Sequence, residues 1–118
     1  MIVAIVDDLM FGSKIRATAE RLGRPVTFVR SAADALATIR AQQPALVIVD
    51  LDRASLDPIN TIRAIKAEPD LAGIRIVGFV SHVQTATIDA ARHAGTDTVL
   101  ARSAFVATLP GLIAAAGN

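Results

Sequence analysis

The sequence predicts an α/β domain with three layers, in which a doubly wound parallel sheet of (βα)5 type has helices on both faces. Two short apolar runs rich in β-branched residues, 2–6 and 45–49, are followed by acidic residues. Continuous apolar runs of this length are typical of strands that are buried on both faces. The 118 residues fit one compact unit, so we expect a single domain over 1–118.

Helical periodicity follows the early strands. The first helix has an apolar face formed by Met10, Ile15, Ala19 and Leu22. Residues 25–29 read as a short second strand, and Ser31 can cap the helix that follows it.

The second half of the chain repeats this alternation. Asp57 and Pro58 mark the start of a helix, because Asp caps well and Pro suits the first helical position. Strands are expected at 74–80 and 98–101, with a helix from about Val83 to Ala94 between them. Ser103 can cap the last helix, in which Pro110 predicts a kink or a late start.

Composition narrows the classes of function. The chain is 53% hydrophobic and 3% aromatic, which predicts an aliphatic core. The net charge of +1, with scattered basic residues, disfavours binding to nucleic acid or to a membrane surface. Cysteine is absent, which fits a reducing cytoplasm, and no run is long enough to span a bilayer. The opening strand lacks a basic leader, so we expect no signal peptide.

Polar side chains stand at four predicted strand ends. They are Asp7, Asp8, Asp50, Ser81 and Arg102. The carboxyl ends of parallel strands share one edge of the sheet, where open α/β folds bind their ligands. Because carboxylates resist crowding, their convergence favours a site for a cation and for chemistry over a purely structural role.

This order of residues resembles the receiver domains of two-component response regulators, the flavodoxin-like phosphoacceptor family, over essentially the whole chain. The resemblance implies that Asp50 is the phosphoacceptor and that Ser81 binds the phosphoryl group. Arg102 stands where the family has a Lys. A carboxylate can attack phosphorus and form an acyl phosphate, and a hydroxyl and a cation can then bind the phosphoryl oxygens.

The resemblance also implies a Mg²⁺ site. Asp8 would bind the metal directly, Asp7 would contribute through water, and Asp50 and the backbone carbonyl of Asp52 would complete the protein ligands. A hard divalent cation with oxygen ligands neutralises the charge that a phosphoryl group brings to these acids.

Several residues depart from the family pattern. Arg is longer and forked, so it does not reproduce the geometry of Lys. The family's Lys-Pro pair is replaced by Arg102-Ser103, for which we expect a trans peptide bond. Val99 stands where the family has a switch aromatic, and His82 stands where it has a small residue.

We compare three alternative functions for this chain. The first is a signalling switch, not a metabolic enzyme: a histidine kinase or phosphotransfer protein phosphorylates Asp50, and a partner reads the face of the fourth helix, fifth strand and last helix. We expect no output domain after Asn118, and the apolar last helix suggests a homodimer. The second is a pseudo-receiver that binds partners without phosphorylation, which the departures at Arg102-Ser103, Val99 and His82 together favour. Arg102 itself could instead form an ion pair with Asp50 or Asp8 that holds this edge together without phosphate. The third, a small metal-dependent hydrolase, lacks a positioned base or nucleophile motif.

Overall fold

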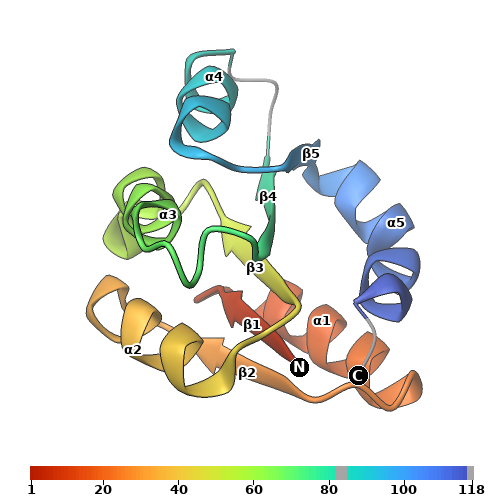
Figure 1. Cartoon of the computed structure of the whole chain (residues 1–118). Coiled ribbons are helices and arrows are strands. Elements are labelled where there is room, and N and C mark those ends of the chain that lie inside the picture. The colour runs from red at the N-terminus through yellow and green to blue at the C-terminus, as the bar shows by residue number, and fades with distance from the viewer. Residues whose placement is uncertain (82–84, 117–118) are drawn as a thin grey trace.

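A computed structural model describes residues 1–81 and 85–116, and its elements alternate as predicted (Figure 1). The strands are β1 (Ile2–Ile5), β2 (Val26–Val29), β3 (Leu46–Asp50), β4 (Arg75–Val80) and β5 (Thr98–Ala101). The helices are α1 (Leu9–Arg21), α2 (Ala32–Gln42), α3 (Pro58–Ala67), α4 (Thr85–Ala94) and α5 (Arg102–Ala115), with a short 3-10 helix at Ala54–Leu56. His82 and the predicted helix start at Val83 lie outside the described residues.

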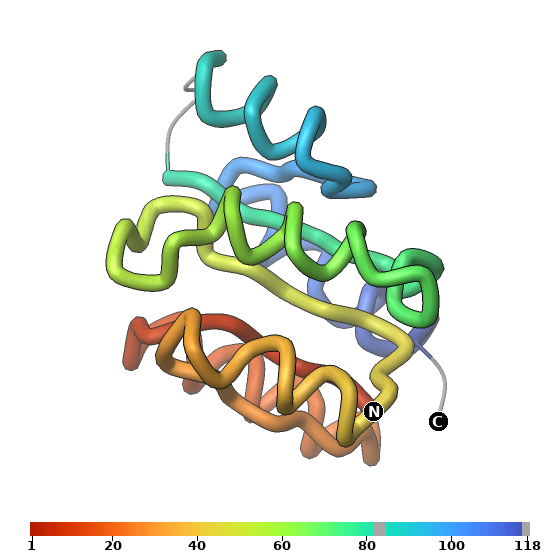
Figure 2. The backbone as a smooth tube through the Cα atoms, turned by 60° about the vertical axis from the view of Figure 1, so that its left-hand side comes forward, coloured from red at the N-terminus to blue at the C-terminus, as the bar shows by residue number. Residues whose placement is uncertain are grey.

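All five strands pair in parallel, in the order β2-β1-β3-β4-β5. Helices α1 and α5 cover one face of the sheet, and α2, α3 and α4 cover the other, as two views at 60° to each other show (Figures 1 and 2). The predicted three-layer doubly wound fold is therefore confirmed. No helix in the described part of the chain has both the length and the apolar character needed to cross a bilayer.

The core differs between the two faces. The face under α2, α3 and α4 is aliphatic, as expected from the composition. Under α1 and α5, however, Phe79 stacks on Phe11 and on Phe105, with ring centroids 5.0 and 4.6 Å apart. The prediction of an aliphatic core is wrong on this face, because three Phe residues are buried there and the fourth, Phe28, is partly buried and packs against the same cluster.

The inward face of α1 was also predicted incorrectly at one position. Met10 is 68% exposed, whereas its neighbour Phe11 is buried. A step of four residues from Phe11 to Ile15 follows the helical repeat, whereas the step of five from Met10 does not. Phe11 therefore takes the inward position, with Ile15 and Ala19 beneath it.

Two predicted caps occupy the expected positions without forming a capping hydrogen bond. The Ser31 hydroxyl donates instead to the Asp34 carboxylate at 2.9 Å. Asp57 has a left-handed backbone with φ of 45°, whereas a capping side chain usually needs an extended one. Its carboxylate accepts from the Asn60 amide at 3.1 Å.

The start of α5 corrects a further prediction. Strand β5 runs directly into the helix, so Ala101 is the N-cap and Arg102 is the first helical residue, which leaves Ser103 in the first turn. The late start suggested for Pro110 is wrong, because the helix is continuous through it. The described residues contain no cis peptide bond, as expected for Arg102-Ser103.

The apolar residues of α5 mostly face the sheet. Leu109 and Ile113 are buried in the core, and Leu112 packs partly against it. These leucine and isoleucine side chains suggested a homodimer in the sequence, but the chain itself covers two of them. Apart from Val106 and Pro110, what α5 leaves exposed is small or polar, including Ala104, Ala114 and Ala115.

Candidate functional site

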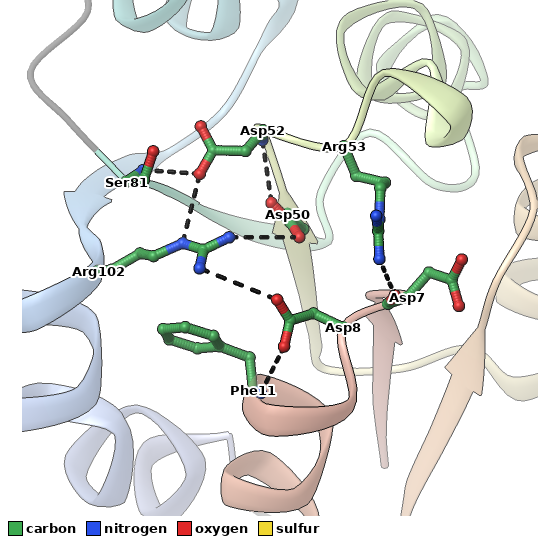
Figure 3. A network of polar contacts seen from close by, with 8 residues as sticks. All are labelled: Asp7, Asp8, Phe11, Asp50, Asp52, Arg53, Ser81 and Arg102. Carbon is green, nitrogen blue, oxygen red and sulfur yellow. Dashed lines mark hydrogen bonds and ion pairs between the residues drawn. The ribbon is translucent and has the colours of Figure 1, made fainter.

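The carboxyl ends of β1, β3 and β5 meet at an open cavity. Its walls are formed by Asp8, Asp50, Asp52, Arg53 and Arg102. Figure 3 shows that three of these carboxylates surround the guanidinium of Arg102. Residues that are distant in the sequence are therefore brought together at the edge where this fold class binds ligands.

Asp50 lies at the bottom of the cavity. It is the last residue of the central strand β3, pairs in register with Phe79 of β4, and is 1% exposed. Its Oδ1 accepts a hydrogen bond from the backbone N–H of Asp52 at 2.9 Å. Burial raises the pKa of the Asp50 carboxyl; the Asp52 N–H and Arg102 oppose the rise, and the neighbouring Asp52 and Asp8 charges add to it.

Asp8 joins the cavity to the start of α1. It is the N-cap of this helix, and its Oδ1 accepts from the Phe11 N–H at 3.0 Å. The other oxygen, Oδ2, lies 3.9 Å from Nη1 of Arg102. The Asp8 carboxylate thus accepts a hydrogen bond from an amide that has no partner within α1, and its second oxygen faces the site.

Asp52 links the loop after β3 to the end of β4. Its Oδ2 accepts from the backbone N–H of Ser81 at 2.7 Å and lies 3.3 Å from Nε of Arg102. The chain can turn toward Asp52 because Leu51 packs against Gly78, where a Cβ would stand 2.8 Å from the Leu51 side chain. The absence of a side chain at Gly78 therefore helps to place Asp52 at the site.

Arg102 contacts all three of these carboxylates from the first turn of α5. Besides the pairs with Asp8 and Asp52, its Nη2 lies 4.0 Å from Oδ2 of Asp50. Its guanidinium lies over the Phe11 ring, 4.5 Å from the centroid. In the part of the chain that the structure describes, Nε is buried without an aligned hydrogen-bond acceptor, so its contact with Asp52 is an ion pair only.

Asp7 is separated from this group. Its side chain is directed away from the other three carboxylates, as Figure 3 shows. Its backbone carbonyl accepts a hydrogen bond from the side chain of Arg53, which is exposed on that side of the cavity. The structure therefore brings Asp8, Asp50 and Asp52 together but leaves the Asp7 carboxylate outside.

The donor set fits a hard divalent cation chemically, because carboxylate oxygens are the ligands that Mg²⁺ prefers. Asp8 and Asp50 both present an oxygen to the cavity. Within residues 1–81 and 85–116, however, no three Asp, Glu, His or Cys side chains are grouped closely enough to hold a metal. The positive charge between these acids belongs to Arg102.

Two parts of the site were not anticipated from the sequence. The Asp52 carboxylate was expected near the site, but its contacts with the Ser81 N–H and with Arg102 were not. Phe11 supports the guanidinium, and it lies three residues after Asp8 at the N3 position of α1. The spacing of Phe11 and Ile15 is a signal that could have identified it as inward-facing.

No protein-family model matches this chain, and neither does any curated protein sequence. The fold, in contrast, is shared with solved structures. The receiver domain of the sensor histidine kinase PA1611 from Pseudomonas aeruginosa, which has a magnesium ion in its active-site cleft, is 21% identical. It superimposes with a TM-score of 0.83 over 98% of this chain and 94% of that one.

Two further solved structures share this fold. The phosphorylated cyanobacterial phytochrome response regulator RcpA is 21% identical, with a TM-score of 0.79 over 95% of this chain and 86% of that one. The chemotaxis response regulator CheY4 of Vibrio cholerae is 14% identical, with a TM-score of 0.83 over 98% and 96%. The chain therefore has the fold of response regulator receiver domains.

Proposed function

We propose that this chain is a phosphoacceptor switch of a two-component system, in which a histidine kinase or a phosphotransfer protein donates a phosphoryl group to Asp50. The observation that carries the proposal is the position of the Asp50 carboxylate, at the end of the central strand and at the bottom of a cavity with Arg102 and Asp8 in its walls. The fold comparisons support it, since the similar structures are response regulators and receiver domains.

The chemistry follows from these groups. An ionised oxygen of Asp50 attacks phosphorus, an O–P bond forms, and the P–N bond to the donor imidazole breaks as that nitrogen takes a proton. The phosphoryl group arrives beside Asp8 and Asp52, which repel it. Mg²⁺ held by Asp8, Asp50 and the Asp52 carbonyl would neutralise this charge. The Asp7 carboxylate would have to turn toward the cavity to contribute through water. Arg102 and the Ser81 hydroxyl would bind the phosphoryl oxygens.

Phosphorylation would be read elsewhere on the surface. Arg102 begins α5 and Ser81 precedes α4, so a change in either contact is transmitted to the face formed by α4, β5 and α5. We propose that this face binds the downstream protein, or a second copy of the chain. The phosphoryl group would then act as a switch of binding and not as an intermediate of metabolism.

Incubation with acetyl phosphate and Mg²⁺, followed by intact-mass measurement, tests the proposal. The wild type should gain one phosphoryl group and Asp50→Asn none, while Asp34→Asn, an exposed carboxylate of α2, should behave as the wild type. Arg102→Lys should increase the yield if the forked side chain limits the site. No adduct from acetyl phosphate, phosphoramidate or a histidine kinase would contradict the proposal.

A second function is favoured by one observation: Arg102 already forms ion pairs with Asp8, Asp50 and Asp52. A site that neutralises itself can hold the fold of a pseudo-receiver, which binds partners without a phosphorylation cycle. In that case Asp50→Asn should leave partner binding or self-association unchanged, as measured by sedimentation with and without phosphodonor. A shift that depends on the phosphodonor would exclude the pseudo-receiver.

A further inference from the structure

We infer that the Arg102 guanidinium, tethered by Asp52, is the resident cation of the cavity, and that a divalent cation must displace it from Asp8 and Asp50 in order to bind. The inference rests on the proposed function, because it concerns the metal that this function needs. It goes further, because two side chains, Arg102 and Asp52, would control the affinity of the cavity for the metal.

The distances place the guanidinium where a metal would compete with it. Its two terminal nitrogens lie 3.9 Å from Oδ2 of Asp8 and 4.0 Å from Oδ2 of Asp50. These oxygens belong to the two carboxylates that fit a metal chemically. Two cations near the same oxygens repel each other, and burial of Asp50 weakens the screening by solvent.

The guanidinium is also held in place from outside this pair of acids. Its central carbon lies over two aromatic rings, 4.5 Å from the centroid of Phe11 and 5.8 Å from that of Phe79. A planar guanidinium stacks on aromatic rings in a way that a flexible ammonium does not. Arg102 is therefore held in front of Asp8 and Asp50.

Asp52 provides the tether. Its carboxylate is itself fixed by the Ser81 N–H at 2.7 Å and lies 3.3 Å from Nε of Arg102, the shortest of the three ion pairs. A guanidinium that swings away from Asp8 and Asp50 can keep this contact. We therefore assign Asp52 the part of a positioning residue, which retains Arg102 beside the site whether or not a metal is bound.

The experiment is a calorimetric titration of the full chain with Mg²⁺ and with Mn²⁺, in the absence of any phosphodonor. Arg102→Met keeps the aliphatic stem on the Phe rings and removes the charge. It should raise the affinity for both ions by about tenfold or more. Arg102→Gln, which also lacks the charge, should do the same.

Arg53→Met is the matched control. Arg53 lines the same cavity, but its side chain bonds to the Asp7 carbonyl and forms no ion pair with the three acids among those described. Its removal should raise metal affinity by no more than about threefold, through long-range charge alone. An equal gain for Arg53→Met and Arg102→Met, or no gain for Arg102→Met, would overturn the inference.

Asp52→Asn tests the tether in a double-mutant cycle. Without Asp52 the guanidinium pairs with Asp8 and Asp50 alone, so the substitution should weaken Mg²⁺ binding more in the wild type than in Arg102→Met. Equal weakening in both backgrounds would remove Asp52 from the mechanism.

Folding of each variant is checked by far-UV circular dichroism, and the metal-induced rise of Tm gives a second measurement of affinity for a less stable variant. The outcome is separable from that of the proposed function, which depends on a phosphoryl adduct. If the affinities follow the expected order but no adduct ever forms, the inference stands and the phosphoacceptor proposal fails. If neither the wild type nor Arg102→Met binds Mg²⁺ or Mn²⁺, the inference is wrong.

Discussion

Two partly buried cations at opposite ends of the sheet bind their surroundings in different ways. Lys66 of α3 lies beneath the start of β4, where its Nζ donates to the carbonyls of Ala72 and Ile74, each at 2.9 Å. The same nitrogen lies 3.5 Å from Oδ2 of Asp97, which also accepts from the Ile76 N–H at 2.8 Å. This ammonium thus donates two hydrogen bonds of ordinary length and has one carboxylate beside it.

Arg102 has more charge around it and fewer hydrogen bonds. It faces three carboxylates at 3.3 to 4.0 Å, and its buried Nε has no aligned acceptor in the described chain. A satisfied cation such as Lys66 stabilises one structure, because any movement breaks hydrogen bonds. An under-satisfied cation beside several anions can exchange partners at small cost. The number of hydrogen bonds therefore distinguishes Lys66, a structural contact, from Arg102, which is suited to a switch.

Replacing Lys66 should have the largest effect on stability. Lys66→Met leaves the carbonyls of Ala72 and Ile74 without this donor and removes the cation beside the Asp97 carboxylate. Hydrogen bonds to charged groups contribute about 2 kcal/mol. We expect a loss of about 2 kcal/mol in the free energy of unfolding by urea, with the phosphoryl adduct unchanged. The control is Lys14→Met on the exposed side of α1, which should change stability by less than about 0.5 kcal/mol. Equal losses would show that Lys66 is not a structural contact.

Phe11 tests whether the aromatic face supports the Arg102 site. Phe11→Leu removes the stacking on Phe79 and the ring beneath the guanidinium, and should cost about 1.5 kcal/mol. Phe28→Leu is the matched control, since Phe28 also carries an arginine, Arg16, over its ring at 4.7 Å but is only partly buried. Its cost should be about 0.5 kcal/mol. Chemical denaturation of both variants would show whether the difference exists.

Asp50→Asn should stabilise the fold at neutral pH, by roughly 1 kcal/mol, because an amide needs less solvation than a buried carboxylate. Burial raises the pKa of Asp50 above its ordinary value of 3.8, so ionisation opposes folding. The wild type therefore carries no penalty below pH 3.8 and the full penalty above the raised pKa of the folded state. Stability measured against pH should show the two proteins converging in acid. A constant difference would show that ionisation is not the cause.

The sequence was informative about this site where the signal is local. Asp8, Asp50 and Arg102 each follow a strand that its apolar run makes recognisable, and parallel pairing then brings them to one edge. The same logic predicts the three layers. These features depend on periodicity alone, which a single sequence contains.

What could not be predicted depends on side-chain directions. Nothing in the order of residues says that the Asp7 carboxylate turns outward while Asp52 turns toward Ser81. That choice depends on the packing of Leu51, the residue after β3, against Gly78 of β4. The contact between Phe11 and Phe79 on one face likewise results from packing against the sheet. Composition gives only the number of Phe residues and not their positions.

The smallest effect on stability is expected from Arg102→Met, and it completes the comparison with Lys66. The ion pairs of Arg102 with Asp8 and Asp50 are long, and its side chain is 30% exposed, so each contributes little in water. Methionine keeps the contact with Phe11, while the three acids lose their cation. We expect a loss below about 1 kcal/mol at 0.1 M salt, which decreases as added salt screens the acids from one another. A salt titration of the urea midpoint measures this. If Arg102→Met costs as much as Lys66→Met and salt does not restore it, the guanidinium is a structural contact after all, and its freedom to exchange partners is lost as an explanation.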